Sequence, residues 1–530
     1  MNIGILTGLV LLPLAGALST AAIDARAARA VRGVGLLTAA LVFALAAVMW
    51  TRFAAGVAGL QFEERAAWVP GIGLGYHLGV DGLSVNLVAL VALLFPLALA
   101  AAPVRDRPKA FVITMLLLEA GLFGTFLAQD MILFYVFWEA MLIPMYFLIG
   151  LWGGPGRAAA AIKFFLYTMA GSVLMLLAII AVYFQGGRAI GAPTFDLPAL
   201  LAHPLGLSGE TEAVLFAAFA AAFAIKMPVW PLHTWLPDAY AEAPPVVTVL
   251  LAGLMAKAGA YGLLRFCLPL FPDASRAFGP LLSTLALVGI LYGGAVAWTQ
   301  GDMRRLLAYG SMSHMGFILL GIFTLDVTGV QGSLIQMINH GVSTGALFLL
   351  AGFLIERTGQ ARTDAYGGAA GVIPAFAAVA LIVVVSSLAL PGTNGFIGEF
   401  LILLGTFQVR PGAAVAATMG VVVAAAYLLA FIGRVFHGPL RDDLRRLPDL
   451  RAREYAVLIP LVLAIFWAGL YPHPLLSRSE ATVTSLLARV ARTQPAQRPS
   501  ARLQVSRGAA PRLQPVRTQP VVSRKPELLP

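Results

Sequence analysis

Apolar runs of about 20 residues recur along this chain up to about residue 471 and decide what it can fold into. A helix needs about 20 apolar residues to cross the roughly 30 Å hydrocarbon layer of a bilayer, whereas a barrel strand needs only about ten alternating ones. The chain is 59% hydrophobic and 12% charged. We therefore predict an all-α polytopic membrane protein with about 14 transmembrane helices, embedded in a lipid bilayer.

The formal net charge of +11 comes from basic residues in short loops and in the C-terminal tail. In a membrane protein such loops set orientation, so the charge does not indicate a nucleic-acid partner. Alternate loops carry most of the loop Lys and Arg, which predicts that these loops are cytoplasmic and that both termini lie outside: 24–32, 103–109, 153–163, 238–245, 299–305, 356–364 and 433–453. The loops predicted on the opposite side carry far fewer: 52–77, 129–130, 185–210, 265–279, 325–329 and 409–412.

Two predicted spans are interrupted. In AAFAIKMPVWPLHTWLPDAYAEAPP, Lys226 and several prolines break an apolar run near 226–237, and in SSLALPGTNGFIGEF a proline and glycines break another near 390–396, before Glu399. A lysine in hydrocarbon is disfavoured by roughly 3 kcal/mol, and proline removes a backbone donor, so protein or water must satisfy both groups. Paired interrupted spans are the signature of inverted-repeat transporters, whose ion sites lie at the breaks.

This pattern predicts five regions along the chain. They are N-terminal transmembrane helices at 1–102, a first inverted five-helix repeat at 110–266, a second at 279–436, a C-terminal transmembrane helix at 455–474, and a basic, disordered tail at 475–530. The stretch 474–492 is alternatively a short interfacial helix.

Several charged residues fall inside predicted spans. Lys226 and Lys257 lie well within them, which indicates functional titration, although a structural ion pair or snorkelling is the alternative; for Lys163, near a span end, snorkelling is an equal reading. Glu139 lies among aromatic and aliphatic residues, so it must be protonated or paired, and Lys226 is its candidate partner. Glu119 either modulates that pair or serves in helix packing.

Two histidines lie in successive predicted spans. His314 and His340 are flanked by Ser, Asn and Thr side chains, and imidazole titrates near neutrality, which suits a proton relay; packing is the alternative role. With Glu399 they extend a possible line of ionisable groups. The order we propose is Glu139, Lys226, Lys257, His340 or His314, and Glu399.

The sequence also argues against several chemistries. It has no phosphate-binding loop, no dinucleotide fingerprint, no nucleophile elbow and no two-histidine metal spacing. The single cysteine, Cys267, excludes an internal disulfide and a cysteine-ligated iron–sulfur cluster within the chain. We expect no cofactor and no metal in this chain, so any redox centres belong to partners.

Three stretches resemble the antiporter-like membrane subunits of respiratory complex I, and most closely the M-type subunit. They are FYVFWEAMLIPMYFLIGLWGG, KMPVWPLHTWLPDAYAEAPP continuing through LLAGLMAKAGAYGLLRF, and LPGTNGFIGEFLILLGTF, and the likeness covers about residues 1–475. The resemblance implies fourteen helices with two inverted five-helix repeats, each containing a discontinuous helix. It also implies an essential pair (Glu139 and Lys226), a connecting lysine (Lys257), polar-axis histidines (His314 and His340) and the acid of the second broken helix (Glu399).

Particular residues separate this chain from related families. L-type and N-type subunits and cation/proton antiporters usually have lysine where Glu399 stands, so this residue favours the M-type. The family usually reads PDAH followed by APT, whereas this chain has Tyr240 and Pro245, so roles of that histidine and threonine are not carried over.

The resemblance implies a proton-translocating membrane subunit of an NADH:quinone oxidoreductase in the bacterial inner (plasma) membrane. Flavin, iron–sulfur clusters and quinone are expected in partner subunits, and L-like and N-like subunits are expected as neighbours. The alternative is a cation/proton antiporter or membrane-bound hydrogenase subunit of the same superfamily. A third reading is a membrane scaffold with inert buried charges.

Overall fold

The computed structural model describes residues 4–103 and 106–492. The described chain is mainly helical, which confirms the all-α membrane fold class. Ten helical segments within it are long and apolar enough to cross a membrane. The exact count of fourteen spans and the inverted repeats stay predictions.

The helices run along the chain as follows: α1 (Ile5–Ala22), α2 (Ala28–Arg52), α3 (Val85–Ala101), α4 (Pro108–Leu127), α5 (Met131–Ala140), α6 (Leu142–Trp152), α7 (Arg157–Ile190), α8 (Leu197–Ala202), α9 (Gly209–Lys226), α10 (Leu236–Glu242), α11 (Pro245–Leu250), α12 (Ala256–Gly262), α13 (Leu268–Leu270), α14 (Pro272–Thr299), α15 (Met303–Ile322), α16 (Val327–Thr358), α17 (Pro374–Ser387), α18 (Asn394–Val409), α19 (Pro411–Phe436), α20 (Ala452–Leu470) and α21 (His473–Arg492). Short 3₁₀ turns η1 (Pro70–Ile72), η4 (Thr363–Ala365), η5 (Ala369–Gly371) and η6 (Asp442–Leu444) lie in the connections.

The first interruption separates α9 from α10. α9 ends at Lys226 and the next helix begins at Leu236, because the intervening prolines lack the N–H groups that a helix needs. The following buried helix is itself irregular, since π-helical segments η2 (Leu251–Met255) and η3 (Leu263–Cys267) flank α12. Such π-bulges are frequent at functional sites.

The second interruption separates α17 from α18, over residues 388–393. Here the chain turns sharply, with Gly392 at φ 90° in the left-handed region that glycine tolerates. Gly395 then allows close packing, because a Cβ there would lie 2.1 Å from the Ser386 carbonyl oxygen. Both interruptions therefore have local causes in proline and glycine.

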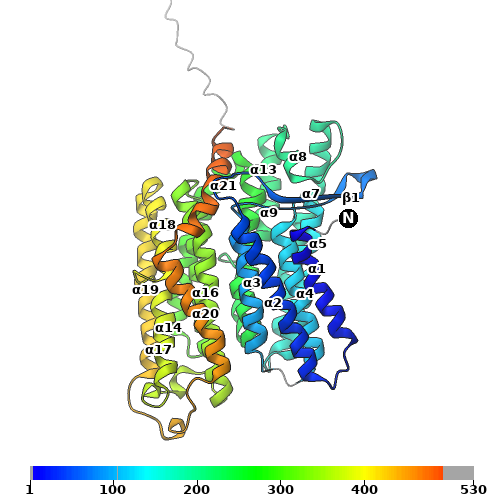
Figure 1. Cartoon of the computed structure of the whole chain (residues 1–530). Helices are drawn as coiled ribbons and strands as arrows, with labels where there is room; N and C mark the ends of the chain where they lie inside the picture. The colour runs from blue at the N-terminus through cyan, green and yellow to red at the C-terminus, as the bar shows by residue number, and fades with distance from the viewer. Residues whose placement is uncertain (1–3, 104–105, 493–530) are drawn as a thin grey trace, which may run out of the picture. The chain divides into compact units, whose positions relative to one another are not determined.

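A β-hairpin follows α2, and the sequence did not predict it. Strands β1 (Gln61–Val69) and β2 (Leu74–Val80) pair antiparallel, in the loop expected at 52–77 and three residues beyond it. Figure 1 shows β1, α8 and α21 at the same end of the helices. The loops 52–77 and 185–210, which the charge pattern assigns to one side, thus share one end of the described chain.

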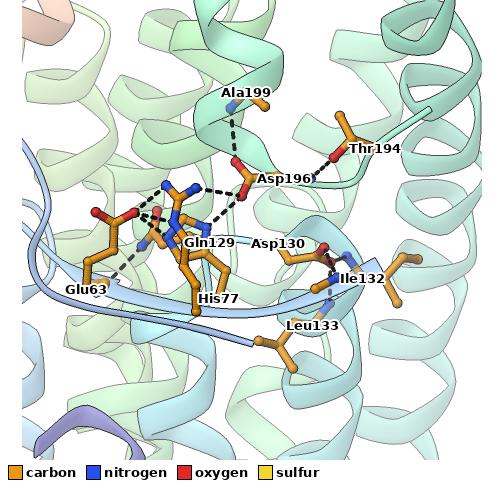
Figure 2. Close-up of polar contacts among 12 residues, drawn as sticks. Glu63, His77, Gln129, Asp130, Ile132, Leu133, Thr194, Asp196 and Ala199 are labelled. Carbon is orange, nitrogen blue, oxygen red and sulfur yellow. Dashed lines mark hydrogen bonds and ion pairs between the residues drawn. The ribbon is translucent and has the colours of Figure 1, made fainter. Parts of the chain in front are cut away.

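A buried histidine ties this hairpin to the segment before α8 (Figure 2). Within β2, His77 Nδ1 lies 2.8 Å from Asp196 Oδ2, and its Nε2 lies 2.9 Å from Glu63 Oε1 on β1. Partial burial acts to raise the pKa of Asp196, but hydrogen bonds from His77 and the Ala199 N–H, with the charge of Arg65, outweigh it and lower the pKa.

The C-terminal region needs a correction. A disordered tail was expected from residue 475, but α21 continues as a helix to Arg492, in line with the alternative of a short helix at 474–492. Its apolar residues explain the order, because they are buried against the rest of the chain: Leu475, Val483, Leu486, Leu487 and Val490. The remainder of the predicted tail, 493–530, lies outside the described residues.

Candidate functional site

Lys257 lies on α12 between the two π-helical segments and is 0% exposed. Its Nζ donates a hydrogen bond to the Ala252 carbonyl oxygen at 2.5 Å and a second, short one to His340 Nδ1 on α16. With Lys257 Nζ as the donor, His340 Nδ1 is the acceptor, which corresponds to the imidazole tautomer that carries its proton on Nε2. The structure therefore brings the predicted connecting lysine and one predicted histidine into direct contact.

His340 continues the line toward α15. Its Nε2 lies 3.1 Å from Ser311 Oγ, and its ring centroid lies 5.6 Å from that of His314. The two histidines are thus neighbours across the contact between α15 and α16. Chains of such groups can pass protons by alternating donors and acceptors.

His314 connects this line to the second broken helix. Its Nδ1 lies 2.9 Å from Glu399 Oε1 on α18, and Gln336 Nε2 donates to the same oxygen at 3.2 Å. A cavity of about 10 Å³, which is room for about one water molecule, adjoins both histidines and Glu399. Its lining includes His314, Gln336, Asn339, His340, Ser343, Ser386 and Glu399.

Lys226 ends α9 and is 1% exposed. Its Nζ lies 4.7 Å from the ring centroid of Trp138 and has no hydrogen-bond partner among the described residues. The predicted partner, Glu139, is half-buried on α5, and its Oε1 is also without a partner in the described chain. The structure does not bring the predicted pair into contact, since no hydrogen bond joins Lys226 Nζ to Glu139 Oε1.

Glycine packing brings the end of α9 directly against α12. A Cβ on Gly259 of α12 would lie 2.5 Å from the Phe223 carbonyl oxygen and 2.8 Å from the Met227 nitrogen. The last turn of α9, which ends in Lys226, therefore rests directly on the helix that carries Lys257. Only glycine permits that approach.

Glu119, Lys163 and His233 lie apart from the Lys257–His340–His314–Glu399 line. Glu119 is fully buried on α4, and neither carboxylate oxygen has a partner in the described region, so no hydrogen bond joins it to the axis. Lys163 is 2.8 Å from Asp238, which also binds Arg305. His233 lies between α9 and α10 and is buried.

The sequence reasoning missed a buried ion pair. Arg265, assigned to a loop, lies in η3 and donates to Asp81 at 2.7 and 2.5 Å and to Tyr261 Oη at 3.0 Å. Lys257, Tyr261 and Arg265 recur every four residues and so share one helix face. That spacing, together with an aspartate inside the apolar stretch around Asp81, was the available signal.

Comparison with known proteins identifies a class of polytopic membrane protein that agrees with this fold. Residues 128–424 match the family described as "NADH:quinone oxidoreductase/Mrp antiporter, TM". NADH-quinone oxidoreductase subunit M of Rhodobacter capsulatus is 42% identical over 479 residues, which is 88% of this chain and 93% of the relative. Subunit M of Escherichia coli K12 is 40% identical, covering 91% and 97%.

A solved structure has the same fold. A chain of respiratory complex I from Thermus thermophilus superimposes with a TM-score of 0.82 at 37% identity, covering 91% of this chain and 99% of that one. The chain belongs to the NADH:quinone oxidoreductase/Mrp antiporter family of membrane subunits. Within that family its likeness is to subunit M. The prediction of a proton-translocating membrane subunit of NADH:quinone oxidoreductase, complex I, is thereby confirmed.

Proposed function

We propose that protons pass through this subunit along Glu139, Lys226, Lys257, His340, His314 and Glu399. The observation that supports this route most strongly is the contact of Lys257 with His340, because it joins two helices through a donor and an acceptor inside an apolar core. The His314–Glu399 hydrogen bond extends the route to the second broken helix.

The driving step in this proposal is a change at the Glu139 and Lys226 pair. A conformational change in a neighbouring subunit brings the two side chains together or separates them, which alters the charge balance beside Lys257. A proton then moves from Lys257 through His340 and His314 toward Glu399. Glu119, buried on α4, modulates the pair through its charge.

The wider setting is also proposed. We infer that L-like and N-like subunits flank this chain in a bacterial inner membrane. Flavin, iron–sulfur clusters and quinone bind to partner subunits, where NADH is oxidised and quinone is reduced, and this chain binds no cofactor. Relatives near 40% identity are named as subunits of NADH-quinone oxidoreductase, which favours this setting over a free antiporter.

The test uses the whole complex in inverted membrane vesicles. Glu139→Ala and Lys226→Ala should abolish proton pumping driven by NADH, whereas Glu210→Ala, at an exposed acid near the start of α9, should leave pumping unchanged. Full pumping in an assembled Glu139 or Lys226 variant would contradict the proposed route. Co-purification with flavin and iron–sulfur subunits tests the setting, and sodium-dependent exchange without such subunits would favour the antiporter.

A further inference from the structure

The ammonium group of Lys226 faces an aromatic ring where a carboxylate was expected. Its Nζ lies 4.7 Å from the Trp138 ring centroid, within the range of a cation–π interaction, and more than 4.0 Å from every carboxylate oxygen in the described residues. A buried ammonium is costly without a compensating contact. The indole face is the contact that the described chain supplies.

Trp138 is held rigidly in place. It is 1% exposed, and its Nε1 donates to Ser172 Oγ at 3.2 Å, while that hydroxyl donates to the Thr168 carbonyl oxygen at 2.8 Å. Its ring packs against Phe134 and Phe223, each with a centroid separation of 5.5 Å. The indole therefore presents one fixed face to Lys226.

Trp138 and Glu139 are consecutive residues on α5, so their side chains point about 100° apart around the helix. Trp138 is directed into the core, whereas Glu139 is half-buried. In this structure the Lys226 ammonium lies over the indole face and forms no hydrogen bond with Glu139. The two contacts are alternatives for the same flexible lysine.

We propose that Trp138 is a positioning residue, a second resting place for the Lys226 ammonium that competes with Glu139. This rests on the proposed function of the Glu139 and Lys226 pair. When the pair separates, the indole face holds the lysine in its charged form within the core, close to the helix that carries Lys257. The weaker cation–π contact also lets the lysine return to the carboxylate, because a hydrogen-bonded carboxylate attracts it more strongly.

The first experiment replaces Trp138 in the intact complex and measures the pH profile of proton pumping in vesicles. Without the ring, the charged lysine is less stabilised in the separated state. Trp138→Leu should therefore move the alkaline limb of the profile down by about one pH unit, and Trp138→Phe, which keeps a weaker ring, by less. Phe111→Leu, at a fully buried ring next to Trp152, controls for packing loss.

The second experiment changes the electronic character of the ring without changing its shape. Fluorinated tryptophans incorporated at position 138 withdraw charge from the ring face, and each added fluorine should move the alkaline limb further in the same direction. A graded shift supports the proposal. An unchanged profile across the fluorinated series, or equal behaviour of Trp138→Leu and Phe111→Leu, would overturn it.

The test of Trp138 and the test of the proton route can fail independently. If Glu139→Ala and Lys226→Ala abolish pumping while the fluorinated series leaves the profile unchanged, the role of Trp138 is wrong and the route through the pair stands. If pumping survives in the Glu139 and Lys226 variants, the route itself is wrong.

Discussion

At the scale of single residues, the buried charges of this subunit differ in how completely they are satisfied. Lys257 has two hydrogen-bond acceptors, and Glu399 receives two donors. Lys226, by contrast, has only an aromatic face in the described chain. A group that is fully bonded is held in place, whereas a poorly bonded one can move. This difference in hydrogen bonding indicates that the Lys226 side chain is free to move during proton transfer, whereas the Lys257 side chain is held in place.

His340 is the residue on which the line depends most. Replacing it with alanine removes the acceptor of Lys257 and the link to Ser311, so we expect proton transfer through this subunit to slow by about 100-fold or more. Proton uptake per NADH oxidised, measured in vesicles, reports the effect. His203→Ala, at an exposed histidine, is the control and should pump normally. Normal pumping by an assembled His340→Ala complex would contradict the role of this histidine.

At the scale of elements, the broken helices could be predicted because proline and glycine act locally. Pro228 and Pro231 end α9, and Gly392 and Gly395 shape the second break. The hairpin could not be predicted in this way, because β1 carries Glu63, Glu64 and Arg65 and β2 contains two glycines, as a loop would. Its pairing depends on contacts with distant segments, such as that of His77 with Asp196.

The packing of α9 on α12 predicts a cost for enlarging Gly259. Alanine there would press on the backbone at Phe223 and Met227, so we expect a loss of about 1–3 kcal/mol in stability and a displaced Lys226. Thermal denaturation of the purified complex and vesicle pumping measure the two effects. Gly289→Ala in α14, where a Cβ meets nothing within 4 Å, is the matched control and should be neutral or stabilising.

The link between the hairpin and α8 predicts a pH dependence. Because the folded protein lowers the pKa of Asp196, its carboxylate stabilises the hairpin above the unfolded pKa of about 3.9, and this contribution is lost as pH falls through the lower, folded value. The protection of the backbone amides of residues 61–80, relative to their intrinsic exchange rates, should therefore decrease as pH falls below about 4. Asp196→Asn should show increased exchange already at neutral pH. Equal exchange in the variant and the wild type would contradict this link.

At the scale of the whole molecule, the sequence predicted the apolar helices better than the side-chain contacts between them. The apolar runs locate the spans, and the rarity of lysine singles out Lys226 and Lys257. The contact of Lys226 with Trp138 could not be predicted, because periodicity carries no distances. Arg265 was missed for a different reason: it was assigned to the predicted loop 265–279, whereas π-helical turns carry the helix through it to Leu270.

The buried pair of Arg265 with Asp81 is expected to stabilise the fold as a whole. The Arg265–Asp81 pair joins the central helix to the turn after β2, where the Gly82 N–H also donates to Thr482 of α21. Asp81→Asn leaves a buried guanidinium without its carboxylate, which costs about 3–5 kcal/mol. We therefore expect the complex to assemble poorly, as measured by the amount of intact complex in membranes.

A double variant separates the charge from the space that the pair fills. Asp81→Asn combined with Arg265→Met removes both charges and keeps the helix packing, so assembly should recover much of the loss, because an apolar replacement of a buried pair is often neutral. If pumping also returns, the pair serves assembly alone. If assembly returns without pumping, then Arg265, on the same helix face as Lys257 and Tyr261, belongs to the electrostatic surroundings of the proton route as well as to the structure that holds it.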